Sequence, residues 1–232
     1  MIKAVFLDFY GTLVEEDDKI VSSIVENVVS NSKSNIINYN DAGQFWRKEF
    51  ISLCNTCNGK NFKLQKEIEY ISLTNTITRF ESNINIENEL KKMFEYWEKP
   101  AIFPDSIFFL EKIQFPVIIV SNIDRNEIIE AIDYNKIDLN NVITSEDTLY
   151  YKPNENMFKM AMEKNNLKAN EIIHIGDSLS SDILGANNVN IKSIWLNRKG
   201  NENKSNAIPN ITANDFYEVI EKIINGKIIQ DK

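Results

Sequence analysis

Residues 2–13 of the chain, IKAVFLDFYGTL, decide the fold. The apolar run from Ile2 to Leu7 ends in Asp8, and Gly11-Thr12 follows closely. This pattern predicts a buried strand that leads into a tight turn. The same theme recurs along the chain. Short, mostly β-branched apolar runs that end in polar residues lie at 115–122, 141–146, 171–177 and 191–197.

The stretches between these runs have apolar residues at helical spacing. Pro153 is expected to open one helix, because proline is favoured in a first turn. A final amphipathic helix that begins near Phe216 is expected to be capped by Asn214 and to end near Gly226. Strands that alternate with helices and are buried on both sides predict an α/β fold. We expect a Rossmann-like, doubly wound parallel sheet with helices on both faces.

Residues 16–99 break this alternation. Their apolar residues follow helical stripes, and no β-run ends there in polar residues. They predict an all-helical insert of about four helices that returns near Pro100, and its aromatic residues are expected to form its own core. The predicted organisation is thus a core formed by 1–15 and 100–232, with a helical cap domain at 16–99.

Composition limits the classes of function. The chain has 232 residues, of which 43% are hydrophobic and 26% charged, and this is ordinary for a folded globular protein. A net charge of -8 argues against general attraction to nucleic acid or anionic membrane. No apolar run has the length of a signal peptide or a membrane span, so a cytoplasmic location is expected.

The two cysteines, Cys54 and Cys57, form the motif C-N-T-C. A zinc site would need two further ligands, and the chain offers one histidine, His174, and no other cysteine. We therefore expect two reduced thiols on a helical segment.

Polar residues gather where the predicted strands end, which is where doubly wound sheets place their active sites. The residues concerned are Asp8, Ser121, Asn122, Lys152, Asp177 and Asp182. Each alone has an ordinary structural explanation, such as a turn, a helix cap or a solvated charge. Together they supply a nucleophile, a hydroxyl and an amide, a cation and a pair of acids on one edge of the sheet.

Four motifs in this order resemble those of the haloacid dehalogenase superfamily. Asp8-Phe9-Tyr10-Gly11-Thr12-Leu13 resembles its first motif, D-x-[D/Y]-G-T-[L/V], and Ser121-Asn122 resembles the second. Lys152-Pro153 resembles the third, and Gly176-Asp177-Ser178 through Asp182 resembles the acidic fourth. The helical insert is similar to the cap that covers this family's site. Ordered motifs in the expected strand context are far more specific than any one pattern.

The resemblance implies a hydrolase that works through a covalent intermediate on Asp8. In the phosphatase branch, Mg²⁺ would be held by Asp8, the backbone carbonyl of Tyr10 and Asp177, with Asp182 in its first or second coordination shell. Ser121 and Lys152 would neutralise the phosphoryl oxygens, and Thr12 belongs to the same catalytic loop. The substrate would be a small phosphorylated molecule.

Tyr10 departs from the phosphatase pattern, in which a second Asp protonates the leaving alcohol. The D-x-Y-G-T form resembles metal-independent 2-haloacid dehalogenases, which act on halogenated substrates. Trp46-Arg47 resembles the pair whose Arg helps to cradle halide there, and Asn122 follows Ser121 as in those enzymes. Arg47 and Asn122 are accordingly predicted to bind substrate.

The fourth motif argues for the phosphatase, because the carboxylates of Asp177 and Asp182 suit a hard divalent cation. Phe158 also stands where dehalogenases carry a tyrosine. A Mg²⁺-dependent phosphatase is therefore favoured, with a dehalogenase and a non-catalytic binding protein as alternatives. The sequence predicts neither the physiological substrate nor the oligomeric state.

Overall fold

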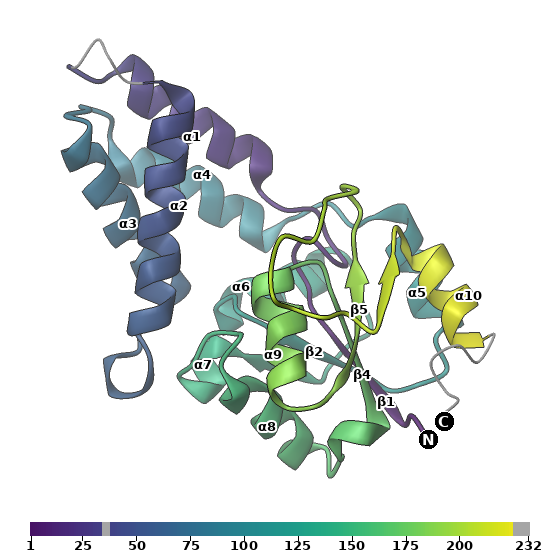
Figure 1. Cartoon of the computed structure of the whole chain (residues 1–232). Helices are drawn as coiled ribbons and strands as arrows, with labels where there is room; N and C mark the ends of the chain where they lie inside the picture. Colours follow the sequence, from purple (N-terminus) through teal and green to yellow (C-terminus); the bar gives the residue numbers. More distant parts are fainter. Residues whose placement is uncertain (34–37, 225–232) are drawn as a thin grey trace.

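The computed structural model describes residues 1–33 and 38–224, which form a central sheet with helices around it (Figure 1). Six strands lie in the order β3-β2-β1-β4-β5-β6, and each strand is parallel to its neighbours. The strands are β1 (Ala4–Leu7), β2 (Val117–Ser121), β3 (Val142–Thr144), β4 (Ile172–Gly176), β5 (Lys192–Leu196) and β6 (Ile211–Ala213). The predicted doubly wound parallel sheet is confirmed.

Five of these strands coincide with the predicted apolar runs, and β6 was not predicted. It has three residues, and of these only Ala213 is buried. Within the part of the chain that the structure describes, β6 pairs with β5 alone, at the edge of the sheet. Edge strands need no apolar residues on both faces, so β6 lacks the pattern that marks the central strands.

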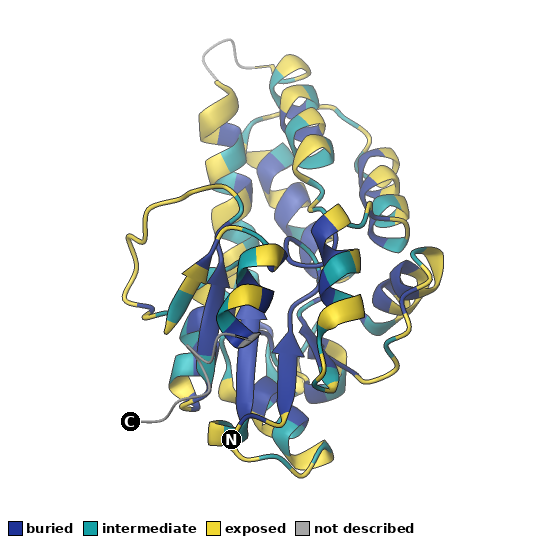
Figure 2. Ribbon diagram, turned by 90° about the vertical axis from the view of Figure 1, so that its right-hand side faces the viewer, coloured by how far each residue is buried: buried dark blue, intermediate teal, exposed yellow. Residues whose placement is uncertain are grey.

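Alternation along β1 divides the core into two layers. Val5 and Leu7 pack in the cluster that contains Phe109 and Phe216, whereas Ala4 and Phe6 pack in a second cluster. The first cluster includes residues of α5 (Pro104–Lys112), α6 (Arg125–Tyr134) and α10 (Phe216–Ile224). The second includes residues of α8 (Glu155–Lys164) and α9 (Leu184–Asn188). Figure 2 shows the buried strands between helices whose outer faces are exposed.

Two helix starts differ from the prediction. The helix after Pro153 begins at Glu155, because Asn154 is its N-cap and accepts from the Asn156 N–H at 3.0 Å. The final helix is capped by Asp215 instead of Asn214, since Asp215 Oδ1 accepts from the Glu218 N–H at 2.8 Å. Its expected end near Gly226 lies outside the described residues.

Four longer helices lie between β1 and α5 and stand apart from the sheet at the upper left of Figure 1. They are α1 (Asp18–Ser30), α2 (Tyr39–Thr56), α3 (Gln65–Arg79) and α4 (Ile86–Glu98). Trp46 and Trp97 are buried among them, but they belong to the same apolar cluster as Val5 and Phe109, so the predicted core of the insert is continuous with one side of the sheet. That 16–99 is a separate domain stays a prediction, and we call this segment the cap.

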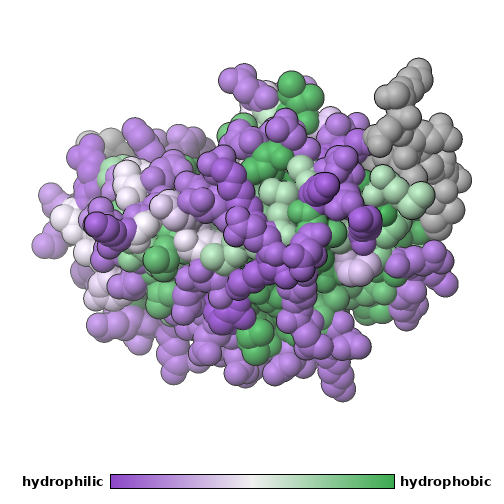
Figure 3. Space-filling view, turned by 90° about the horizontal axis from the view of Figure 1, so that it is seen from below, coloured by the Kyte–Doolittle hydropathy of each residue, from purple (hydrophilic) through white to green (hydrophobic). Residues whose placement is uncertain are grey.

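Further features complete the fold. A short helix, α7 (Ser145–Thr148), a π-helix (Leu179–Ile183) and two 3₁₀ turns, Gly59–Asn61 and Ala169–Glu171, join the larger elements. Cys54 and Cys57 are free thiols. None of the helices in the described residues has the length and apolar character needed to cross a bilayer. The face seen in Figure 3 is mostly hydrophilic, and hydrophobic groups show in separate areas.

Candidate active site

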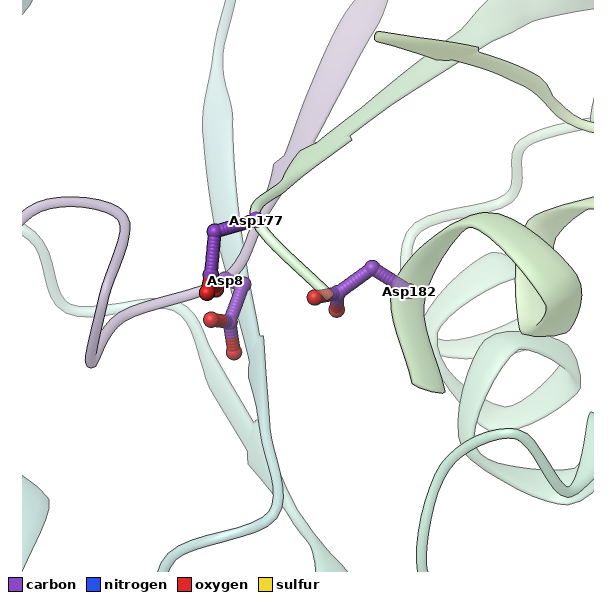
Figure 4. A group of neighbouring side chains, drawn as sticks. All are labelled: Asp8, Asp177 and Asp182. Atoms are coloured by element: carbon purple, nitrogen blue, oxygen red, sulfur yellow. The ribbon is translucent and has the colours of Figure 1, made fainter. Parts of the chain in front are cut away.

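The carboxyl ends of neighbouring parallel strands bring the predicted side chains together. Asp8 follows β1, Ser121 ends β2 and Asp177 follows β4. The Asp8 N–H donates to the Ile175 carbonyl at 3.0 Å, so the backbone pairing of the sheet continues up to the predicted nucleophile. Figure 4 shows Asp8 and Asp177 side by side, with Asp182 facing them from the start of a helix.

The loop after Asp8 is tightly folded. The Phe9 carbonyl accepts from the N–H groups of Thr12 at 3.3 Å, Leu13 at 2.8 Å and Val14 at 3.1 Å. Gly11 has a φ of 77°, and a Cβ there would lie 2.8 Å from the Asp177 carboxylate. A glycine is required on both counts, because L-residues disfavour this conformation and no space exists for a side chain.

Thr12 connects two of the acids. Its hydroxyl lies 3.3 Å from Asp8 Oδ2 and 3.3 Å from Asp177 Oδ1. A single hydroxyl proton can serve only one of them at a time, so the other carboxylate depends on a different partner. Thr12 thus orients both acids without neutralising either.

Lys152 is the cation of the site, and 5% of it is exposed. Its Nζ donates to Asp8 Oδ1 at 2.6 Å, to Asp182 Oδ1 at 2.6 Å and to the Val120 carbonyl at 2.8 Å. Burial lowers the pKa of Lys152, but the charges of Asp182 and Asp8 outweigh burial and raise it, so the ammonium stays charged. One lysine therefore serves two acids.

The three acids differ in ionisation. Burial, together with the charge of Asp182, raises the pKa of Asp8 to about 7, although Lys152 opposes this. Burial and the charge of Asp8 raise the pKa of Asp177 well above its ordinary value. Burial also tends to raise the pKa of Asp182, but Lys152 and His174 lower it to about 2. Asp182 is therefore the main ion-pair partner of Lys152. The carboxyl groups of Asp8 and Asp177 are less well compensated by this single positive charge.

This donor set fits a hard divalent cation. Single oxygen atoms of Asp8, Asp177 and Asp182 all lie within 4.8 Å of one another. Both carboxylate oxygens of Asp182 already contact protein groups. Oδ1 contacts Lys152 and His174, and Oδ2 accepts from the Ser178 N–H at 3.1 Å.

The other candidate ligands have more freedom. The Asp177 carboxylate has one protein donor among the described residues, the Thr12 hydroxyl, and the Tyr10 carbonyl accepts no backbone hydrogen bond there. Asp8, Asp177 and the Tyr10 carbonyl could thus hold Mg²⁺, with Asp182 in the second coordination shell.

The Tyr10 side chain forms a hydrogen bond with the cap. Its hydroxyl donates to the Trp97 carbonyl at the end of α4, and its ring packs edge-to-face on Phe9 with centroids 5.2 Å apart. Burial, and then the charges of Glu127 and Asp17, raise the pKa of Tyr10 well above its ordinary value. The phenol therefore stays protonated and has an acceptor in the protein, which makes it a poor proton donor for a leaving group.

The remaining predicted residues lie in two places. Ser121 is buried beside Val120, and its hydroxyl has no partner among the described residues. Asn122 Oδ1 accepts from the Lys152 N–H at 2.7 Å, so this amide fixes the lysine backbone. Arg47 is exposed on α2 and makes no ion pair or hydrogen bond with the described residues, and its contact with substrate stays a prediction. Its neighbour Trp46 is buried and donates to Ser72 Oγ at 3.0 Å.

Sequence reasoning missed two residues that support the site. His174 is fully buried on β4, and its Nε2 lies 3.0 Å from Asp182 Oδ1. Arg198 donates to the Thr12 carbonyl at 3.0 Å and to Asp105 at 2.8 Å, so it ties the nucleophile loop to α5. The polar His174 inside an apolar strand was a signal that could have been used. No local pattern joins Arg198 to Thr12.

A cavity of about 330 Å³ opens beside Gly11 and Asp177. The two segments that connect the cap to the core, and the loop after β5, form its walls. Apolar lining comes from Ile20, Tyr96, Phe103 and Leu196, among others. The cavity therefore lies next to the candidate metal position.

Known proteins resemble this chain in sequence and in fold. A stretch of 108 residues is 32% identical to the ribulose-1,5-bisphosphate 5-phosphatase of Halopiger xanaduensis, over 43% of this chain and 44% of that protein. A stretch of 45 residues is 48% identical to the glyceraldehyde 3-phosphate phosphatase of Pyrococcus furiosus, over 19% of each. These matches span less than half of either relative. The L-2-haloacid dehalogenase of Xanthobacter autotrophicus superposes with a TM-score of 0.75 over 97% of this chain and 99% of that one, at 16% identity, which shows the fold alone.

The profile of the haloacid dehalogenase-like hydrolases matches residues 2–190, which is most of the chain. The matched region includes the nucleophile loop, the cap, the lysine and the acidic motif. The chain therefore belongs to the haloacid dehalogenase-like hydrolases.

Proposed function

We propose that the chain is a Mg²⁺-dependent phosphatase that acts on a small phosphorylated metabolite through a covalent intermediate on Asp8. The observation that carries the proposal is the packing of three acids, Asp8, Asp177 and Asp182, whose oxygens lie within 4.8 Å of one another around a single lysine. All three cannot be ionised together without a further cation, and the raised carboxyl pKa values of Asp8 and Asp177 agree with this. A hard divalent cation would relieve this repulsion. The names of two relatives, both phosphatases, support the same choice.

Asp8, Lys152 and Ser121 would each have a separate role in the reaction. An Asp8 oxygen forms a bond to phosphorus while the bond from phosphorus to the ester oxygen breaks, and the departing alkoxide takes a proton from solvent. Water then attacks the phosphorus of the acyl phosphate, which releases inorganic phosphate and restores the Asp8 carboxylate. Lys152 Nζ lies 2.6 Å from Asp8 Oδ1, and the Ser121 hydroxyl has no partner within the described residues, so both would neutralise the phosphoryl oxygens. Bound Mg²⁺, held by Asp8, the Tyr10 carbonyl and Asp177, would supply further charge neutralisation at these oxygens.

A 2-haloacid dehalogenase is the second candidate, because Tyr10 stands where phosphatases carry the acid. A departing halide needs no proton, so the bonded phenol of Tyr10 would be no handicap. The cluster of Asp8, Asp177 and Asp182 argues against it, because three acids so close together suit a divalent cation, which a halide-releasing reaction does not need. A non-catalytic binding protein would retain the site without turnover. A cytoplasmic location stays a prediction.

A panel of phosphate esters and 2-haloacids, each assayed with Mg²⁺ and with a chelator, tests the proposal. We expect release of inorganic phosphate that needs Mg²⁺ and is lost in Asp8→Asn. Halide release that persists in chelator would overturn the proposal in favour of the dehalogenase. Ligand binding without turnover of either class would favour the binding protein.

A further inference from the structure

The cap contacts the core far from the segments that connect them. We call residues 57–64, which join α2 to α3, the cap tip. In the cap tip, the Gly59 N–H donates to the Leu149 carbonyl at 2.8 Å, and Asn58 Oδ1 accepts from the Tyr151 N–H at 3.1 Å. The tip is therefore bonded to the core segment 149–151, which directly precedes Lys152.

Tyr151 belongs to the core by sequence but to the cap by packing. Only 3% of it is exposed, and it clusters with Cys57 and Ile68 of the cap. Its ring stacks on Phe62 with centroids 5.5 Å apart, and its hydroxyl donates to the Lys63 carbonyl at 2.7 Å. Because the backbone and the side chain of Tyr151 both bond to the cap tip, its position depends on that of the cap.

Lys152 is held by the core instead. Its backbone N–H donates to Asn122 Oδ1, and its ammonium reaches Asp8, Asp182 and the Val120 carbonyl. A single peptide bond thus joins a residue fixed by the cap to the cation of the site. The ammonium contacts are 2.6 to 2.8 Å long, so a small displacement of this backbone would weaken them.

The other phosphate-binding segment has a contact of the same kind. Asp124, two residues after Asn122, accepts from the N–H groups of Gln65 at 2.7 Å and Lys66 at 3.0 Å. A core carboxylate thus caps α3 of the cap, an arrangement that the helix dipole favours. Lys66 also forms an ion pair with Glu127. Both segments that carry the predicted phosphate ligands are therefore bonded to the cap near its tip.

We propose that Tyr151 is a positioning residue that couples docking of the cap tip to the placement of Lys152. The contacts of Tyr151 with Lys63 and Asn58 set the backbone from which the Lys152 ammonium reaches Asp8 and the bound phosphoryl group. The assignment rests on the proposed phosphatase function for its kinetic consequences. The coupling itself rests on the contacts alone.

Two variants weaken the coupling from opposite sides. Tyr151→Phe removes the hydroxyl that bonds to Lys63 and keeps the stacked ring, and Tyr70→Phe is its control, the same change at a half-exposed tyrosine of α3. Asn58→Ala removes the acceptor for the Tyr151 N–H, and Asn55→Ala is its control on the exposed side of α2.

Hydrogen exchange is the first measurement, because it needs no turnover. We expect the Lys152 amide to exchange faster in Tyr151→Phe and Asn58→Ala than in the wild type and the two controls. Unchanged exchange at Lys152 in both variants would overturn the coupling. If the wild type hydrolysed no phosphate ester, the proposed function would fail, and this comparison would still decide the coupling.

Kinetics and binding are the second measurement. In Tyr151→Phe we expect kcat for p-nitrophenyl phosphate and the affinity for inorganic phosphate each to fall roughly two- to tenfold, the effect of one hydrogen bond. The Mg²⁺ affinity should change less than either value, because Thr12 contacts Asp8 and Asp177 independently of Lys152. Faster exchange with unchanged kcat and phosphate affinity would mean that the contacts are merely structural, and would overturn the positioning role.

Discussion

Substitution of Gly11 by alanine tests whether the nucleophile loop sets the position of Asp177. Gly11 has a φ of 77°, and an alanine Cβ would lie 2.8 Å from Cγ and one oxygen of Asp177. The left-handed backbone alone costs an L-residue about 1–2 kcal/mol. In a chain of this length each kcal/mol lowers Tm by roughly 2–4 °C, so the strain should lower Tm by about 2–8 °C. The contact with Asp177 adds to this and forces its carboxylate to shift.

Gly200→Ala is a matched control, because Gly200 has a φ of 64° and no atom within 4 Å of the built Cβ. Both variants suffer the backbone strain, but only Gly11→Ala displaces a proposed Mg²⁺ ligand. We expect Gly11→Ala to weaken Mg²⁺ binding by roughly 10–100-fold, the usual effect of disturbing the support of a metal ligand, and Gly200→Ala to leave it unchanged.

The assay pairs thermal unfolding in chelator with calorimetric titration of Mg²⁺. Unfolding in chelator measures how much the backbone strain and the contact with Asp177 lower the stability of the metal-free protein. Titration measures how much the displacement of Asp177 weakens Mg²⁺ binding. If Gly11→Ala bound Mg²⁺ as tightly as Gly200→Ala, Asp177 would not be a ligand of the ion, or its position would not depend on the loop. Equal Tm values for the two variants in chelator would show that the contact with Asp177 relaxes without cost.

Three further predictions follow from the same site. Asp8→Asn should abolish phosphate release while the far-UV spectrum stays native, because the attacking charge is lost and the shape is kept; turnover near the wild-type level would exclude Asp8 as the nucleophile. In chelator, the contribution of Asp8 to stability should be complete below about pH 4 and be lost as pH rises through about 7, because its pKa of about 7 lies above the ordinary 3.8 and the folded state holds that proton more tightly; the difference in unfolding free energy between wild type and Asp8→Asn, measured with denaturant at several pH values, should therefore change over this range, and a constant difference would contradict the raised pKa. Wild-type rates should depend steeply on the leaving-group pKa, since Tyr10 donates to Trp97 instead of to a departing alkoxide, and Tyr10→Asp should raise alkyl-ester turnover more than aryl-ester turnover; equal wild-type rates for both ester types at saturating Mg²⁺ would mean that another residue supplies the proton.

The sequence predicted that the polar residues of the candidate site meet at one edge of the sheet, because parallel strands end together and each end has its own polar residue. Asp8, Ser121 and Asp177 were located in this way, and Lys152 joined them through its motif. Whether each of the other elements could be predicted depended on the strength of its local sequence pattern. The short edge strand β6, with one buried residue, had too weak a pattern to be predicted.

Contacts between distant segments could not be predicted. The bonds from Tyr151 to Lys63 and from Asp124 to Gln65 join residues that are about 60 to 90 positions apart, and neither partner lies in a distinctive local pattern. The phenol of Tyr10 is a similar case, since its acceptor is a backbone carbonyl of the cap. Hydrophobic periodicity reports which face of an element is buried, but not which element covers it.

The central position of β1 has a consequence for synthesis of the chain on the ribosome. Val5 pairs with Val117 of β2 on one side and with Ile173 of β4 on the other. Both edges of β1 therefore stay unpaired until these later strands have been synthesised. At typical rates of translation, the first partner emerges roughly 5–20 seconds after β1. During that interval the local contacts of the cap helices can form, whereas β1 exposes an apolar strand with unpaired edges. Aggregation of the nascent chain should therefore begin at β1, and chaperones that shield short apolar strands should raise the yield of folded protein.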